Sequence, residues 1–235
     1  MSAYQPLGTS GMKNYRLYKR GVDLAILISA HIALLPVWLL LWALIPVLIR
    51  MEDRGPIFYR QVRIGKDGRL FTLRKFRTMV VNADKIGPRW NIDGDRRVTR
   101  VGRFLRRTAL DELPGLISIW RGDMSFVGPR ALDVIEHQLL ERRIPGFSRR
   151  LQVSPGLTGL AQVYNLTDAA RPKLFYDLLY IRRMSLQLDL ALVFLSVRNT
   201  LTARWDRRTG KSAVPVPAAE SAHPQTEAEP SATRG

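Results

Sequence analysis

Two adjacent carboxylates near the middle of the chain carry the strongest chemical signal in the sequence. Asp111 and Glu112 follow a segment, residues 93–110, that holds six arginines. One carboxylate can hold Mg²⁺ and the other can attack phosphorus, provided that nearby positive charge neutralises the phosphate. The pattern therefore predicts a site where a divalent metal, a phosphate and a carboxylate nucleophile meet.

The same residues also fit the start of an ordinary helix. Thr108 and Asp111 have a spacing that suits a capping box. Alternatively, Asp111 is itself the N-cap, and Pro114 is tolerated in the first turn. The residues alone are compatible with both a helix start and a phosphate site.

A second acidic pattern, Asp93-Gly94-Asp95, matches the D-x-D metal motif of nucleotide-sugar glycosyltransferases. A three-residue pattern recurs by chance, so it is a weak indication of that class. No G-x-G-x-x-G follows a strand and no G-x-x-x-x-G-K-[ST] occurs, so neither a dinucleotide fold nor a P-loop ATPase is supported.

The composition excludes several kinds of catalytic and metal site. The 235 residues include 37 Lys and Arg against 20 Asp and Glu, a net charge of +17, and no Cys. Thiolate nucleophiles, disulfides and cysteine-ligated metals are therefore excluded. The three histidines, His31, His137 and His223, lie far apart in sequence, which argues against a histidine metal cluster or a Ser-His-Asp triad. The charge implies an anionic partner: nucleic acid, anionic lipid or a phosphorylated substrate.

An apolar run, residues 24–49, is the strongest structural signal, since only Ser29 and His31 in it are polar. As one straight helix it would reach about 39 Å, enough to cross a bilayer. Pro36 interrupts it, and each half alone is too short to cross. Basic residues flank both ends, which favours a cytoplasmic position for both. We expect a re-entrant helix over residues 21–50, with a plain transmembrane span as the alternative. The flanking residues are Lys13, Arg16, Lys19 and Arg20 before the run and Arg50, Arg54, Arg60 and Arg63 after it.

The remaining patterns predict an α+β fold dominated by helices. Residues 57–64 and 70–76 are β-rich and are joined by a Gly-Lys-Asp-Gly turn, which predicts a small hairpin. Residues 186–197 are mostly apolar and have basic residues on both flanks, which suits an interfacial helix, with a buried core helix as the alternative. Residues 134–153 mix apolar and basic positions at roughly helical spacing and suit a second interfacial pair.

Four regions follow from these patterns. We expect a basic N-terminal segment (1–20), the re-entrant membrane helix (21–50), a cytoplasmic catalytic domain with interfacial helices (51–205) and a disordered tail (206–235) rich in Pro, Ala, Ser and Glu.

Several longer motifs, in fixed order, resemble the bacterial sugar transferases, which are monotopic polyprenyl-phosphate phosphoglycosyl transferases. The motifs are KFRTM from Lys75, LRRTALDELP around Asp111, GDMSFVGPR ending at Arg130 and PGLTGLAQV from Pro155. The resemblance runs from about residue 18 to 199 and indicates the minimal form of the family, with one membrane element.

The resemblance implies transfer of a sugar-1-phosphate from a UDP-sugar to polyprenyl (undecaprenyl) phosphate, with release of UMP. According to this resemblance, Asp111 is the nucleophile that forms a phosphosugar-aspartyl intermediate, and Glu112 binds Mg²⁺. Lys75, Arg106 and Arg130 match basic positions around the phosphates, and Asp177 matches a further acidic site position.

The resemblance also implies a place and partners. It puts the catalytic domain on the cytoplasmic face of the bacterial inner membrane, against anionic lipids, at the first membrane step of polysaccharide or glycoconjugate synthesis.

The charge alone also allows a membrane-anchored nucleic-acid-binding protein, but the acidic pair beside the arginines would weaken such binding, so we expect no nucleic-acid partner. The sugar, the pathway and the oligomeric state stay open. The sequence departs from the family pattern at Leu35, where the family has Ser before the proline, and at Gly115, Ser118 and Ala131.

Overall fold

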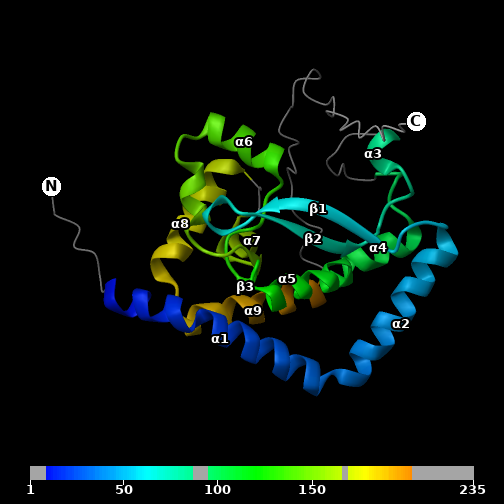
Figure 1. The fold of residues 1–235 in the computed structure, drawn as a ribbon, viewed down its shortest axis with the longest axis horizontal. Helices are drawn as coiled ribbons and strands as arrows, with labels where there is room; N and C mark the ends of the chain where they lie inside the picture. The colour runs from blue at the N-terminus through cyan, green and yellow to red at the C-terminus, as the bar shows by residue number, and fades with distance from the viewer. Residues whose placement is uncertain (1–8, 87–94, 166–168, 203–235) are drawn as a thin grey trace, which may run out of the picture.

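The computed structural model describes residues 9–86, 95–165 and 169–202. Helices dominate, and the described strands form two small two-stranded sheets, in agreement with the predicted fold class (Figure 1). A compact body holds the sheets and most of the helices, and two long helices project below it in a V. The tail predicted over residues 206–235 lies outside the described residues.

The apolar run folds as two helices instead of one. α1 covers Thr9–Ala33 and α2 covers Leu35–Glu52, and the break lies at Leu34, whose φ of −112° and ψ of 20° are not helical. Pro36 lies in the first turn of α2, where its missing N–H costs no helical hydrogen bond. By length and composition, α2 is the one described helix that could span a membrane.

Trp38 secures the bend between the two helices. Its indole Nε1–H donates to the carbonyl of Ala30 at 3.1 Å, and its ring stacks on His31 with centroids 4.9 Å apart. The His31 ring in turn bonds to the carbonyl of Leu27 at 2.7 Å. Side chains on both sides of the break therefore fix the bend, although Leu35 offers no hydroxyl before Pro36.

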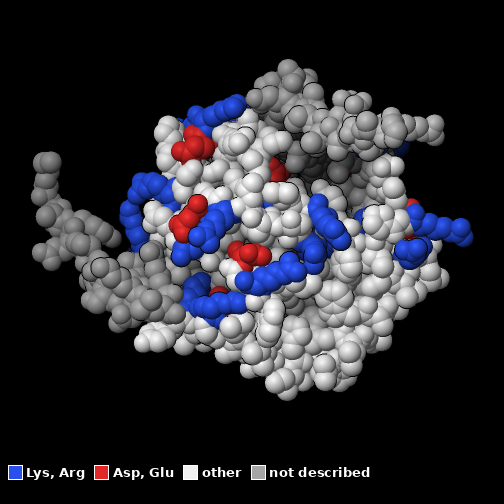
Figure 2. All heavy atoms as spheres, viewed as in Figure 1, with Lys and Arg blue, Asp and Glu red and all other residues white. Residues whose placement is uncertain are grey.

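Both arms of the V pack against the same body. Leu27 of α1 is buried in one core cluster with residues of β2 and α5, whereas Ile45 and Ile49 of α2 are buried in another, against Phe76 and Leu105. Near the bend the apolar side chains are exposed: Ile32 is 73%, Leu39 65% and Leu40 61% exposed. The charged side chains in Figure 2 lie on the body and leave the bend white.

The predicted hairpin is confirmed. β1 (Phe58–Ile64) and β2 (Leu70–Phe76) pair antiparallel, with Tyr59 opposite Lys75, and a short 3-10 turn, η1 (Lys66–Gly68), connects them. Gly68, with a φ of 79°, supplies the left-handed backbone that the turn needs. The second sheet is a parallel pair of β3 (Ser125–Val127) and β4 (Gly156–Thr158).

Short helices complete the body around the two sheets. In chain order they are α3 (Ala83–Ile86), α4 (Arg100–Arg107), η2 (Leu110–Gly115), α5 (Leu116–Arg121), α6 (Val134–Arg143), η3 (Phe147–Gln152), α7 (Leu160–Tyr164), α8 (Ala170–Arg183) and α9 (Leu186–Leu201). α9 lies beside α1 near the base of the body, whereas α6 lies at the opposite end, far from the bend (Figure 1).

Two basic residues before the apolar run are engaged inside the protein. Lys19 is 7% exposed and forms an ion pair with Asp189 of α9. The Arg20 guanidinium donates to the carbonyls of Ile119 and Trp120 at the end of α5. These two side chains thus attach α1 to the body, in addition to any effect of their charges on membrane topology.

Candidate active site

A strained turn presents the two adjacent carboxylates. α4 ends at Arg107 with Thr108 as its C-cap, and Ala109 follows with a φ of 55°, a left-handed conformation that is costly for a residue with a Cβ. The chain then enters η2, which carries Asp111 and Glu112 in its first turn without a side-chain cap. The Thr108 hydroxyl donates to the carbonyls of Phe104 and Leu105, behind it in α4. The capping interpretation is therefore wrong, and neither carboxylate is used as a cap.

Glu112 is held between two cations. Lys75 Nζ of β2 donates to Glu112 Oε1 at 2.5 Å, and Arg130 Nη2, just after β3, lies 4.0 Å from the same oxygen. Burial disfavours the charged form of Glu112, but Lys75 and Arg130 outweigh it and lower the pKa of Glu112 to about 2. Glu112 is thus a permanent anion at neutral pH.

Asp111 lies in a different environment from its neighbour. Among the described residues, its carboxylate forms no ion pair or hydrogen bond with another side chain, although Lys75 and Arg106 act on it at longer range. Burial first, and then the negative charge of Glu112, raise the pKa of Asp111 to about 6. An anion that is unpaired and poorly solvated retains its nucleophilicity, whereas Glu112 is tied to its cations.

Arg106 completes the charged cluster around the pair. It lies in the last turn of α4, and its Nε donates to the hydroxyl of Thr78 at 2.8 Å. Its charge and that of Asp111 stabilise one another, although burial lowers the pKa of the guanidinium overall. The structure thus brings together five of the six predicted site residues, Lys75, Arg106, Asp111, Glu112 and Arg130.

The sixth, Asp177 on α8, lies behind the site. It is 1% exposed, and its Oδ2 accepts from Nε of Arg150 at 2.7 Å. Arg150 also donates through Nη2 to the carbonyl of Arg130 at 2.8 Å. Asp177 is therefore connected to the site through Arg150 and the carbonyl of Arg130. Sequence reasoning missed Arg150 because no local pattern links residues 150 and 177.

A pocket opens beside Glu112, and Arg63 of β1 forms part of its wall. The Arg63 guanidinium donates to the carbonyl of Ala131 at 3.0 Å, so this residue belongs to the site rather than to the membrane flank where the sequence placed it. Two of the departures from the family pattern, Gly115 and Ala131, also line the pocket, whereas Ser118 is buried outside it. The pocket is lined by Arg63, Leu73, Lys75, Glu112, Gly115, Met124, Arg130, Ala131, Gly156 and Leu157.

The acidic side chains present fit a Mg²⁺ ion that is bound partly by the protein and partly by phosphate oxygens of a substrate. In the described part of the chain, no three acidic or histidine side chains converge. Glu112 has one oxygen engaged by Lys75, and its Oε2 has no partner among the described residues. Mg²⁺ is commonly bound by one or two carboxylates together with phosphate oxygens and water, which this arrangement allows.

The alternative acidic motif is only partly described. Asp93 and Gly94 lie outside the described residues. Asp95 is engaged by Arg97, whose Nη2 lies 2.6 Å from Oδ2 and whose Nε lies 2.9 Å from Oδ1. Arg97 lowers the pKa of Asp95 to about 2. Both carboxylate oxygens of Asp95 are thus engaged by Arg97.

Comparisons with known proteins agree with the motifs. The bacterial sugar transferase family matches residues 14–203. The UDP-N-acetylgalactosamine-undecaprenyl-phosphate N-acetylgalactosaminephosphotransferase of Aeromonas hydrophila is 38% identical over 80% of this chain and 44% of its own length. The UDP-glucose:undecaprenyl-phosphate glucose-1-phosphate transferase of Klebsiella pneumoniae is 40% identical over 77% of this chain and 39% of its own.

A shorter relative matches along nearly its whole length. The exopolysaccharide production protein PSS of Rhizobium leguminosarum bv. phaseoli is 35% identical over 78% of this chain and 95% of its own. The chain thus spans less than half of the Aeromonas and Klebsiella relatives but almost all of this one. With its motifs in order and its carboxylates assembled with Lys75, Arg106 and Arg130, the chain belongs to the bacterial sugar transferase family.

Proposed function

We propose that this protein transfers a sugar-1-phosphate from a UDP-sugar to undecaprenyl phosphate and releases UMP. The observation that carries the proposal is the asymmetry of the pair: Asp111 has no side-chain partner among the described residues and a raised pKa, whereas Glu112 is fixed by Lys75 and Arg130. Relatives over the same residues are named for UDP-sugar:undecaprenyl-phosphate sugar-phosphate transfer and for exopolysaccharide production.

The reaction proceeds in two displacements at one phosphorus. The Asp111 carboxylate attacks the sugar-linked phosphorus, the bond from that phosphorus to the bridging oxygen breaks, and UMP leaves with the oxygen. The resulting phosphosugar-aspartyl intermediate is attacked by a phosphate oxygen of the lipid, which forms the diphosphate and frees Asp111.

The basic residues make these steps feasible for an anionic nucleophile. Lys75, Arg106 and Arg130 surround the pair and neutralise the phosphate oxygens as negative charge gathers on them. Mg²⁺ held by Glu112 and phosphate oxygens would add further charge neutralisation. The Ala109 turn fixes the direction in which Asp111 leaves the backbone, so the nucleophile is placed before the substrate binds.

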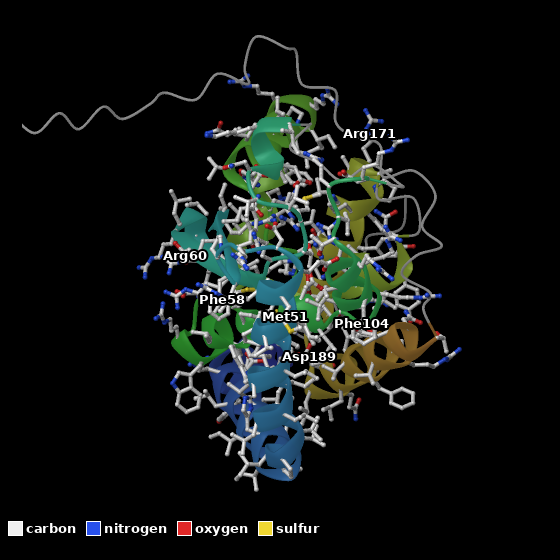
Figure 3. The ribbon with its side chains drawn as sticks, turned by 90° about the vertical axis from the view of Figure 1, so that its right-hand side faces the viewer. Met51, Phe58, Arg60, Phe104, Arg171 and Asp189 are labelled. Atoms are coloured by element: carbon white, nitrogen blue, oxygen red, sulfur yellow. The ribbon has the colours of Figure 1, made fainter. Side chains whose placement is uncertain are left out.

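The V of α1 and α2 is, in this proposal, a re-entrant membrane helix whose two ends lie on the cytoplasmic face of the bacterial inner membrane. The exposed apolar side chains at the bend and the absence of charge there support insertion. Both arms return to one body, which a single straight span could not do. Seen from the side, the side chains of the lower α1–α2 arms are mostly carbon, and nitrogen and oxygen gather above (Figure 3).

α9 extends this apolar surface as an interfacial helix. One face packs into the body through the buried Leu192, and the other exposes apolar side chains in one stripe along the helix. Such a stripe beside the membrane helix suits the headgroup–acyl boundary, and neighbouring arginines suit anionic headgroups. α6, at the far end of the body, is not part of this surface. The exposed stripe consists of Leu186, Leu190, Phe194 and Val197, which are 44%, 49%, 67% and 53% exposed.

The catalytic proposal is tested with purified protein, Mg²⁺, undecaprenyl phosphate and UDP-sugars, with UMP as the readout. We expect UMP release that depends on Mg²⁺ and falls at least 1000-fold, to order of magnitude, in Asp111→Asn, because the amide cannot form the acyl phosphate. Asp67→Asn is the matched control, since Asn tolerates the left-handed backbone of Asp67 in the η1 turn. Full activity in Asp111→Asn would refute the nucleophile, and release of UDP would indicate a glycosyltransferase of the D-x-D type.

Single cysteines test the topology, because the chain has none of its own. Tyr18, Leu39 and Met51 are 69%, 65% and 78% exposed, so burial within the protein does not distinguish them. In sealed inverted membrane vesicles, we expect cysteines at 18 and 51 to react with an impermeant maleimide and a cysteine at 39 to be protected. Labelling of 18 and 51 from opposite sides would establish a plain transmembrane span instead.

A further inference from the structure

Gly115, at the end of η2, has a backbone conformation that does not require glycine. Its φ of −63° and ψ of −23° are those of a right-handed helix, which any residue adopts. A Cβ at this position would lie 3.6 Å from Leu73 Cδ1 and 3.9 Å from Leu157 Cδ1, which are ordinary contact distances. Glycine is also less favourable than alanine in a helix. What distinguishes Gly115 is the space that its missing side chain leaves.

That space belongs to the pocket beside Glu112. Charged groups form one part of the lining, among them Lys75 and Arg130, which the proposed reaction uses to hold phosphate, and Glu112, which would hold Mg²⁺. Leu73, Met124 and Leu157 form the apolar part, next to Gly115. A ligand here would have one end on the phosphate-binding charges and an apolar group against the leucines.

Arg63 gives the pocket a donor that the protein leaves unused. Its two terminal nitrogens donate to Ala131 O at 3.0 Å and to Gln61 Oε1 at 2.6 Å. Its Nε is buried and has no hydrogen-bond partner among the described residues. Buried donors are usually paired, so this nitrogen is an exception, and it would reach an acceptor on a ligand only after a shift of the side chain or its neighbours.

We infer that this pocket receives the 2-acetamido group of the donor sugar, and that Gly115 sets the room for it. The inference rests on the proposed function and names its substrate class. The sugar carbon that bears the phosphate is C1, so the group on C2 is the sugar substituent nearest to the phosphate-binding charges. An acetamido group offers a carbonyl oxygen for the Arg63 guanidinium and a methyl for the leucine side.

A plain hydroxyl at C2 fits the same place less well. It sets a polar group against Leu73 and Leu157 without a partner there. The names of the relatives do not agree on one sugar, because one is named for N-acetylgalactosamine and five are named for glucose. The pocket chemistry favours the acetamido sugar for this chain.

The experiment compares kcat/KM for UMP release in two matched pairs of donors. These are UDP-N-acetylglucosamine against UDP-glucose and UDP-N-acetylgalactosamine against UDP-galactose. We expect the acetamido donor to be preferred about 10- to 200-fold in at least one pair, the range for a small apolar group in a fitted pocket. Gly115→Ala should reduce this preference about tenfold, through a higher KM for the acetamido donor, because its Cβ occupies the methyl site.

Gly21→Ala is the matched control for this substitution. Gly21 is an exposed glycine of α1, and a Cβ there would meet nothing within 4 Å, so the sugar preference should not change. Both variants should keep the wild-type melting temperature or exceed it.

Three results would overturn the inference while leaving the proposed function intact. They are a wild-type enzyme that favours both plain hexoses or makes no distinction, a preference that survives Gly115→Ala, and an equal loss for all four donors in that variant. Failure to release UMP from any UDP-sugar would instead count against the proposed function itself.

Discussion

Lys19 and Asp189, 170 residues apart in sequence, form a buried ion pair that joins α1 to α9, the first and the last of the described helices. Asp189 also accepts hydrogen bonds from the hydroxyls of Tyr15 at 2.7 Å and Tyr180 at 2.8 Å. One carboxylate therefore gathers α1, α8 and α9 at the base of the body, where the arms of the V begin.

Removing one charge of this pair should destabilise the fold. Asp189→Asn removes the carboxylate that pairs with the buried Lys19 ammonium and leaves it only the longer-range charge of Asp23, so we expect a loss of up to about 3–5 kcal/mol in the free energy of unfolding. The double variant Lys19→Met/Asp189→Asn should lose less than the sum of the two single variants, because neither charge of the pair is left without the other. Unfolding in lipid nanodiscs measures all three, and strict additivity would show that the two charges are not coupled.

The two adjacent carboxylates should have opposite effects on stability. Because the folded protein raises the pKa of Asp111 to about 6, its ionised form costs stability at pH 7, and the cost is relieved as the pH falls from 6 towards 4. In metal-free protein at pH 7, Asp111→Asn should therefore stabilise the fold by about 1 to 3 kcal/mol.

Glu112 is the opposite case and serves as the comparison. Its pKa is lowered to about 2, so its ionised form stabilises the fold above pH 4.5, and this stability is lost as the pH falls from there towards 2. Glu112→Gln should lower the melting temperature at pH 7 and leave Lys75 without its partner. The same direction of change in both variants would contradict the assigned charge states.

The pair of Asp177 and Arg150 should separate stability from activity. Asp177→Asn leaves Arg150 buried and unpaired, so we expect a loss of about 3–5 kcal/mol. Asp177→Leu/Arg150→Met should recover most of that stability but still slow UMP release, by up to about 100-fold, because the Arg130 carbonyl has lost its donor. Recovery of both properties would show that Arg150 has no positioning role.

Trp38 should contribute to the bend through both its ring and its indole N–H. Trp38→Phe keeps a ring against His31 but loses the hydrogen bond to Ala30, and we expect a cost of about 0.5–1.5 kcal/mol. Trp38→Leu loses the stacking as well and should cost more. Trp120, 58% exposed on α5, provides the control as Trp120→Phe, which should change little. Equal stabilities for all three variants in nanodiscs would show that Pro36 alone sets the bend.

Local patterns were enough to predict the elements and the central carboxylates. The hairpin follows from two β-rich runs around a glycine turn, and the break in the apolar run follows from Pro36, because each is decided within a few residues. The prediction that Asp111 and Glu112 meet Lys75 and Arg130 came from the order of the motifs, which carry information about distant contacts that no single window contains.

The errors and omissions concern side chains whose partners are distant in sequence. Lys19 and Arg63 looked like membrane-flanking charges, but Lys19 is buried against Asp189 and Arg63 lines the pocket. Asp177 stays a predicted site residue, and no local pattern indicated that it is connected to the site through Arg150. Thr108 looked like a cap and instead bonds backwards into α4, because the left-handed turn at Ala109 separates it from η2. None of these outcomes depends on local propensity, so no local pattern could have given them.

The pairing of Lys19 with Asp189 has a consequence for how the chain is made. At about 5–20 residues per second, roughly 10 to 30 seconds separate the synthesis of the two residues. In the proposed topology, α1 can enter the bilayer during that interval, while the carboxylate that anchors its base has yet to leave the ribosome. Under that topology the body is assembled on a membrane anchor that is already in place, and its closure waits for α9.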